Sequence, residues 1–187
     1  MICSGKRILG VEDGSFEAFS AASRSTYLCG VAMDSGVITD VRLAEISVDG
    51  MDATDGLLGI MEGLKLDAVI LGGITFAGFN VLNPFRVLEE KMVPLIVYSG
   101  VRPDNESMLR ALKAHFGDWE ARWGIVERLG DVHEAVTFSG EPGIYFEAVG
   151  CEPSWAEEVL RSAAAVSRIP EPVRVAGIIA RGLSPAC

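Results

Sequence analysis

Short apolar runs alternate with polar segments along the first quarter of the chain. Residues 7–11, 27–33 and 37–48 have the composition of strands, and the letters DSG between the last two are typical of a hairpin turn. We therefore expect three strands that pair antiparallel. The segment 14–26, rich in Ser, Ala and Gly, predicts a loop between the first two strands.

The middle of the chain changes to an alternation of strands and helices. An apolar stripe predicts a helix that begins at Asp52 or Thr54 and runs to about residue 64. The elements expected after it are a strand at 67–71, a helix at 81–91, a strand at 93–98 and a helix at 107–116. This alternation is typical of parallel strands joined by right-handed crossovers.

The last third of the chain predicts one strand and two helices. Residues 144–149 have strand character, and a helix is expected over 154–166 with Ser154 as its N-cap. The letters PEP at 170–172 precede a final helix that ends near residue 183. Residues 119–139 show no clear pattern.

Together these elements predict an α/β fold of the ribonuclease-H-like class. Three antiparallel strands followed by parallel strands form one mixed sheet, with helices on both faces and a C-terminal helical layer. A chain of 187 residues with 49% hydrophobic positions is long enough for one sizeable core. We expect a single domain that spans residues 1–187.

Charge and cysteine usage narrow the classes of function. The chain carries 16 Lys and Arg against 26 Asp and Glu, a net charge of −10, which argues against a generic basic nucleic-acid binder but leaves room for a local basic groove. The four cysteines lack the spacing of a zinc site. No apolar run is long enough to span a bilayer and no signal peptide is recognisable, so we expect a cytoplasmic protein.

Candidate functional residues lie where the predicted strands end. In open sheets, ligands bind beyond the carboxyl ends of the strands, and Glu12, Asp13 and the Gly72-Gly73 turn fall at such ends. Glu12 and Asp13 are candidate metal ligands, or one of them a general base, and the alternative is a solvated turn completed by Gly14. Both interpretations are open from the residues alone.

Other candidates also have a functional and a structural interpretation. Asp52 is a candidate metal ligand or a helix cap. Gly73, Thr75 and Asn80 form either a loop that lets backbone amides approach an anion or a close-packed turn. Arg174 either contacts a phosphate or attaches the last helix through a carboxylate.

Four strings in order resemble a known family. They are GVEDGSF from residue 10, VDGMDAT from 48, LGGITFAGFN from 71 and IPEPVRVAGIIA from 169. These strings are similar to an uncharacterised, mainly archaeal family called domain of unknown function ninety-nine, which is itself similar to endonuclease V. The resemblance runs from about residue 6 to residue 183.

The resemblance implies a magnesium-dependent nuclease site. Its catalytic acidic residues would be Glu12, with Asp13 beside it, and Asp55, and the magnesium ligands would be drawn from Glu12, Asp13 and Asp52. The positions at which endonuclease V has an aspartate and a histidine are Gly72 and Gly177. Glycine offers no side-chain ligand, so we expect magnesium to bind weakly or only together with substrate.

Two functions follow as expectations. The first is an endonuclease-V-like protein that binds nucleic acid or a nucleotide at the strand ends, with weak or absent metal-dependent hydrolysis. The alternative is a non-catalytic interaction module on a degenerate nuclease fold. Trp119, Trp123 and Trp155 are candidate anchors for a homodimer.

Overall fold

The structure is a computed structural model that describes residues 5–16 and 24–184. Its strands are β1 (Arg7–Asp13), β2 (Ser25–Asp34), β3 (Val37–Ser47), β4 (Ala68–Leu71), β5 (Thr75–Phe76), β6 (Asn80–Val81), β7 (Leu95–Ser99), β8 (His133–Ala135) and β9 (Ile144–Val149). Its helices are α1 (Ala53–Ile60), α2 (Pro84–Lys91), α3 (Asn105–His115), α4 (Trp119–Glu127), α5 (Pro153–Ala163) and α6 (Glu171–Leu183).

Seven strands form one mixed sheet in the order β3-β2-β1-β4-β7-β9-β8. The β1, β2 and β3 strands pair antiparallel, β4 and β7 continue from β1 in parallel, and β9 and β8 pair antiparallel. The predicted α/β fold with a mixed sheet is therefore confirmed. The β8 strand and the α4 helix lie in the stretch whose pattern predicted no element.

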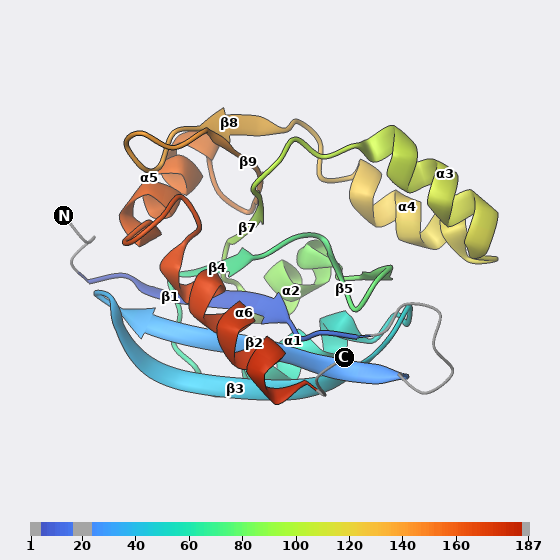
Figure 1. Cartoon of the computed structure of the whole chain (residues 1–187), viewed down its shortest axis with the longest axis horizontal. Helices are drawn as coiled ribbons and strands as arrows, with labels where there is room; N and C mark the ends of the chain where they lie inside the picture. The colour runs from blue at the N-terminus through green and yellow to red at the C-terminus, as the bar shows by residue number, and fades with distance from the viewer. Residues whose placement is uncertain (1–4, 17–23, 185–187) are drawn as a thin grey trace.

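Helices cover both faces of the sheet. The α1 and α2 helices pack on one face over the larger hydrophobic core, and α5 and α6 cover the other, as Figure 1 shows. The α3 and α4 helices project beyond the end of the sheet where β1 and β4 finish (Figure 1). Glu12, Asp13 and the Gly72-Gly73 turn lie at this end of the sheet.

Several predicted helices begin or end at other residues, among them α3, which the sequence predicts over 107–116. The first, α1, ends at Ile60. The second, α2, begins at Pro84 because Asn80–Val81 pairs with Thr75–Phe76 as a small hairpin, and the Asn83 side chain caps the helix. The α5 helix begins at Pro153 and ends at Ala163, and Glu152 rather than Ser154 is its N-cap residue. Residues 17–23 of the predicted loop lie outside the described residues.

The α6 helix lies directly on β1 because β1 has glycine where the two meet. A Cβ atom at Gly10 would lie 2.2 Å from the backbone carbon of Pro172 and 2.3 Å from the backbone nitrogen of Val173. At Gly14 a Cβ would lie 2.9 Å from the carbonyl oxygen of Ala180. Backbone thus contacts backbone along the helix, which no side chain at these positions permits.

The β3 strand is one edge of the sheet, and its outward side chains are partly uncovered. Val37, Val41 and Leu43 are exposed apolar residues on this strand. Trp119 and Trp155 are half-buried under the ammonium groups of Lys113 and Lys6. The homodimer stays a prediction. Among residues 5–16 and 24–184, no helix is long and apolar enough to cross a membrane.

Replacing Gly10 with alanine tests the docking of α6. We expect Gly10→Ala to lower the free energy of unfolding by about 3 kcal/mol, because the added methyl group overlaps the α6 backbone. The matched control is Gly59→Ala in α1, where a Cβ meets nothing within 4 Å and alanine should add about 0.5–1 kcal/mol. Urea unfolding measures both, and equal stabilities of the two variants would contradict the contact.

Candidate functional site

Two adjacent carboxyl groups mark the end of β1. The Glu12 side chain points at the turn after β4, where a Cβ on Gly72 would lie 2.2 Å from Glu12 Oε2. The Asp13 carboxylate accepts a hydrogen bond from the backbone nitrogen of Ala77 at 2.5 Å. The backbone nitrogen of Asp13 in turn donates to Glu12 Oε1 at 3.3 Å. The structure thus brings Glu12 and Asp13 together at the predicted place.

Burial makes this pair hold a proton. Loss of solvent raises the pKa of Glu12 to about 8, and the negative charge of Asp13 adds to the rise. Burial also raises the pKa of Asp13, against the hydrogen bond from Ala77. The positive charge of Arg181 lowers the pKa of both groups. At neutral pH the Glu12 carboxyl group is therefore largely protonated.

Side chains of neighbouring residues occupy the space beside the two glycines. The Glu12 carboxyl group lies over Gly72, as described above. A Cβ on Gly177 would lie 2.9 Å from both terminal guanidinium nitrogens of Arg181 and 3.0 Å from Glu12 Cγ. The resemblance described above would place an aspartate at residue 72 and a histidine at residue 177. The space beside these two glycines is instead occupied by the Glu12 carboxyl group and the Arg181 guanidinium group.

The loop that holds Asp13 is locally strained. Ala77 has a φ of 45° and Asp49 a φ of 57°, both in the left-handed region that non-glycine residues seldom adopt. The backbone nitrogen of Asp49 donates to the Ala77 carbonyl oxygen at 2.8 Å, and the Asp49 carboxylate accepts from the backbone nitrogen of Phe79 at 2.9 Å. This geometry directs the Ala77 N–H at Asp13.

A buried arginine fastens this loop to α4. The guanidinium group of Arg122 donates to the carbonyl oxygens of Gly50 at 2.9 Å, Phe79 at 2.5 Å and Asp49 at 3.0 Å. It also forms an ion pair with Asp118 at 2.9 Å. Because Arg122 is only 4% exposed, these bonds satisfy a charge that burial would otherwise penalise. The helix α4 therefore holds the strained loop in place.

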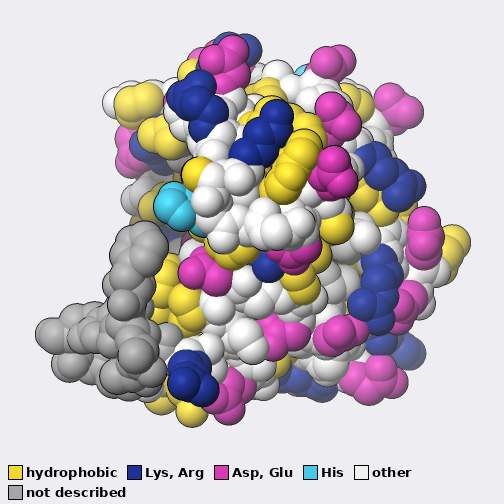
Figure 2. All heavy atoms as spheres, turned by 90° about the vertical axis from the view of Figure 1, so that its right-hand side faces the viewer, with side chains coloured by type: hydrophobic (Ala, Val, Ile, Leu, Met, Phe, Trp, Pro, Cys, Tyr) yellow, Lys and Arg dark blue, Asp and Glu magenta, His cyan; other side chains and the backbone are white. Residues whose placement is uncertain are grey.

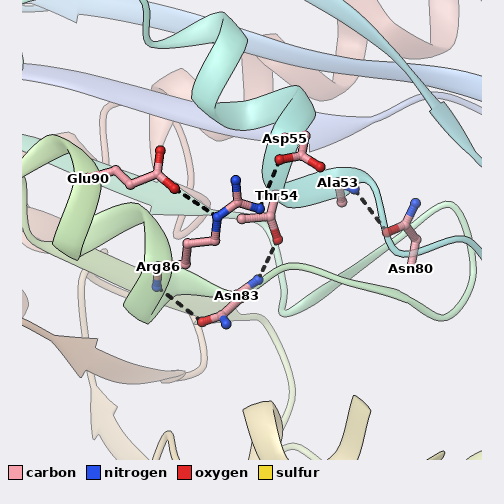
Figure 3. A network of polar contacts seen from close by, with 7 residues as sticks. All are labelled: Ala53, Thr54, Asp55, Asn80, Asn83, Arg86 and Glu90. Carbon is pink, nitrogen blue, oxygen red and sulfur yellow. Dashed lines mark hydrogen bonds and ion pairs between the residues drawn. The ribbon is translucent and has the colours of Figure 1, made fainter. Parts of the chain in front are cut away.

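Asp52 and Asn80 bond to each other and to the backbone. Hydrogen bonds from Ser47 and Asn80 outweigh burial and lower the pKa of Asp52. Asn80 is completely buried, and its amide nitrogen donates to Asp52 Oδ1 at 2.6 Å. Its amide oxygen accepts from the backbone nitrogen of Ala53 at 3.0 Å (Figure 3). Asn80 therefore holds the start of α1 and presents no free group to a ligand.

Asp55 and Arg174 also lie apart from the carboxyl pair. Asp55 forms an ion pair with Arg86 of α2 at 2.8 Å, and its side chain is 66% exposed (Figure 3). Arg174 pairs with Glu171 of its own helix at 2.6 Å. Within the described part of the chain, no three His, Cys, Asp or Glu side chains are grouped so as to hold a metal ion. The acidic residues therefore do not gather into one cluster there.

The turn after β4 opens onto a cavity. Thr75 continues this turn as part of β5 and pairs with Val81. Gly73 lines a cavity of about 210 Å³, together with Glu147 of β9. Burial raises the pKa of Glu147 to about 7. Glu147 therefore joins Glu12 as a second buried acid at this end of the sheet.

Sequence reasoning missed Glu147, Arg122 and Arg181. Arg181 follows Gly177 by one helical turn, which places the two on the same face of α6, and this spacing was a usable signal. Glu147 is the one charged residue in the strand IYFEAV. Arg122 lies in a stretch without periodicity and had no signal.

The surface at this end of the sheet carries both signs of charge. Figure 2, which views the right-hand side of Figure 1, shows Lys and Arg side chains interspersed with Asp and Glu rather than a continuous basic patch. Such a surface does not repel phosphate uniformly.

Comparison with known proteins places the chain among archaeal relatives. The model of a family described as endonuclease dU matches residues 4–184. A UPF0215 protein of Methanothermobacter thermautotrophicus is 38% identical over 183 residues, which are 95% of this chain and 87% of the relative. A protein of unknown function from Archaeoglobus fulgidus has a crystal structure with a TM-score of 0.84 and 30% identity, covering 97% of this chain and 99% of that one.

The fold is also that of endonuclease V. A crystal structure of endonuclease V from Ciona intestinalis, in complex with a 23-mer DNA that contains an inosine, has a TM-score of 0.62. It is 12% identical and covers 95% of this chain and 85% of that one. The predicted resemblance to both families is thereby confirmed.

The raised pKa of Glu12 predicts a pH-dependent stability. The folded state holds the Glu12 proton more tightly than the unfolded state, so this group makes the protein less stable as pH rises from about 4.5 to about 8. Glu12→Gln removes the ionisation and should raise the free energy of unfolding by about 1–3 kcal/mol at pH 9 but little at pH 4. Urea unfolding at both pH values measures this, with exposed Glu89→Gln as the control. A gain of the same size at both pH values would contradict it.

Proposed function

The chain belongs to the endonuclease dU family, and from this premise we propose that it binds DNA across the carboxyl ends of β1 and β4 and cleaves it slowly beside deoxyuridine. The observation that carries the proposal is the half-buried Glu12–Asp13 pair at the end of β1, with Arg181 beside it. A fold shared with an endonuclease V bound to DNA supports the same end of the sheet as the binding face.

The donor groups fit one magnesium ion better than two. Magnesium is commonly held by one or two carboxylates together with substrate phosphates, and Glu12 and Asp13 supply two. A two-metal site needs further carboxylates, and Gly72 offers none. Glu12 and Asp13 would hold the ion, which when bound neutralises charge that develops on the phosphate. Such a site should bind magnesium more weakly without nucleic acid than together with it.

The residues of the chain have distinct roles in the proposed reaction. Arg181 contacts a phosphate oxygen of the bound strand and orients it over the pair. Glu12 gives up its proton to solvent when the pair holds the ion, so that two carboxylates face the phosphate, with Asp13 fixed by the backbone N–H of Ala77. The oxygen of a water molecule then bonds to phosphorus, the bond from phosphorus to the leaving oxygen breaks, and the proton that the water loses passes through solvent to that leaving oxygen. A single carboxyl pair stabilises the transition state less than a full metal-binding cluster, which is why we propose slow cleavage.

Cleavage is tested on a labelled DNA strand that contains one deoxyuridine. With magnesium or manganese we expect a cut beside the deoxyuridine, no cut in the thymidine control, and at least a tenfold (~1.4 kcal/mol) loss of rate in Glu12→Gln and Asp13→Asn. The control variant is Glu89→Gln, which should cleave like wild type. Binding without cleavage by wild type would refute the enzymatic proposal and favour the interaction module.

Arg181→Gln tests the phosphate contact. We expect weaker binding to every DNA sequence, and the slope of log affinity against log salt should fall by about 1, because one phosphate contact is lost. Fluorescence anisotropy at several salt concentrations measures it. Arg161→Gln on α5 is the matched control, and a slope unchanged by Arg181→Gln would remove Arg181 from the interface.

Magnesium without DNA should stabilise the protein only slightly. For a site of about millimolar affinity, 10 mM magnesium adds roughly 1.4 kcal/mol, a rise in Tm of about 3 °C. Calorimetry at matched ionic strength measures the shift, which Glu12→Gln should abolish. Identical melting with and without magnesium would show that the pair holds no cation in the absence of DNA.

A further inference from the structure

A cavity of about 210 Å³ lies between the carboxyl ends of β4 and β7, the neighbouring strand β9, and the projecting helices α3 and α4. Its walls are mainly apolar, with a few polar groups. The apolar side chains include Ile74, Met108, Val126 and Leu129, and Ser99 and Asn105 are among the polar residues. Binding pockets for planar organic rings have this character, with apolar walls and a small number of placed polar groups.

The Glu147 side chain is the unusual part of this lining. The residue is only 4% exposed, and the hydrogen bond that lowers its pKa comes from its own backbone. Among the described residues, no other side chain contributes to that pKa, and its oxygen atoms are not among those fully enclosed without a partner. Glu147 lines the cavity, and a carboxyl group so little exposed needs a hydrogen-bond donor.

The cavity lies next to the turn that the Glu12 carboxyl group contacts. Gly73 lines it, and the preceding residue, Gly72, lies against the Glu12 carboxyl group. The charge of Glu12 also raises the pKa of Tyr98, another lining residue, after the larger effect of burial. A nucleotide can therefore place its phosphate near Glu12 and its base in the cavity.

We propose that this cavity takes a nucleobase whose ring carries an N–H donor, and that Glu147 accepts the hydrogen bond from that N–H. The proposal rests on the proposed binding of nucleic acid and names the group that selects the base. Uracil has such a donor at N3, whereas the ring nitrogen of cytosine at that position is an acceptor. An ionised Glu147 that faces an acceptor leaves both groups unpaired, so cytosine is rejected above the pKa of Glu147, which is about 7.

Mononucleotides test the proposal without any cleavage. The probes are deoxyuridine monophosphate, its N3-methyl analogue and deoxycytidine monophosphate, titrated calorimetrically into the full chain at about pH 8.5, where Glu147 is ionised. We expect wild type to bind deoxyuridine monophosphate about tenfold more tightly than either of the others, the worth of one good hydrogen bond to a charged acceptor. Equal affinities for the three ligands would overturn the proposal.

Variants separate the hydrogen bond from the shape of the cavity. Glu147→Leu keeps the volume but removes the acceptor, so it should bind all three ligands alike, and Glu147→Gln should keep part of the preference. The control is the exposed Glu134→Gln, which should behave like wild type. If Glu147→Leu still rejects the N3-methyl analogue and cytosine, the selection comes from shape and Glu147 has no part in it.

The proposed base-binding cavity and the proposed cleavage can fail independently of each other. Base-selective binding by wild type that disappears in Glu147→Leu, with no cut in DNA, would uphold the cavity and refute the nuclease. Cleavage beside deoxyuridine that is unchanged in Glu147→Leu would uphold the nuclease and overturn the cavity. Circular dichroism of each variant shows that it is folded before either measurement is interpreted.

Discussion

The contact between α6 and β1 is the constraint on which the rest of this structure depends. Glycine at residues 10 and 14 lets the helix backbone lie on the strand backbone, and this approach determines how deeply the end of β1 is buried. Burial in turn displaces the ionisation of Glu12 and Asp13. The helix also brings Arg181, a charge of opposite sign, beside them. The packing of α6 on β1 therefore also influences the ionisation of the carboxyl pair.

The two glycines at 72 and 177 change what the site can do rather than merely removing groups from it. Because neither residue has a side chain, the Glu12 carboxyl group lies inward over Gly72, and Arg181 covers Gly177. An endonuclease-V-like arrangement of three acidic groups and a histidine is thereby exchanged for a carboxyl pair and an arginine. The exchange leaves a positively charged group beside the carboxyl pair and fewer side chains that could hold a metal ion, which is the combination expected of a slow enzyme or of a binding protein.

The sequence predicted the sheet well because strand burial is a local property, readable from runs such as 7–11. It also located the carboxyl pair, since both residues directly follow an apolar strand. It could not place Asp55, because a small shift in helix register decides whether a side chain faces the site or the solvent, and here the carboxylate pairs with Arg86. Glu147 escaped notice because the cavity that it lines is formed together with helices α3 and α4, which are distant in sequence.

The dependence of β1 on α6 also has a consequence for how the chain is made. Synthesis proceeds from the amino end, so β1, β2 and β3 leave the ribosome long before the last helix. Until α6 arrives, the face of the sheet formed by Cys29, Val31 and Met33 has no cover, because α6 supplies the rest of that small hydrophobic cluster. This face of the sheet can therefore be covered only after residues 171–183 have been synthesised. A chain truncated before them would expose the apolar face to chaperones and to neighbouring chains on the polysome.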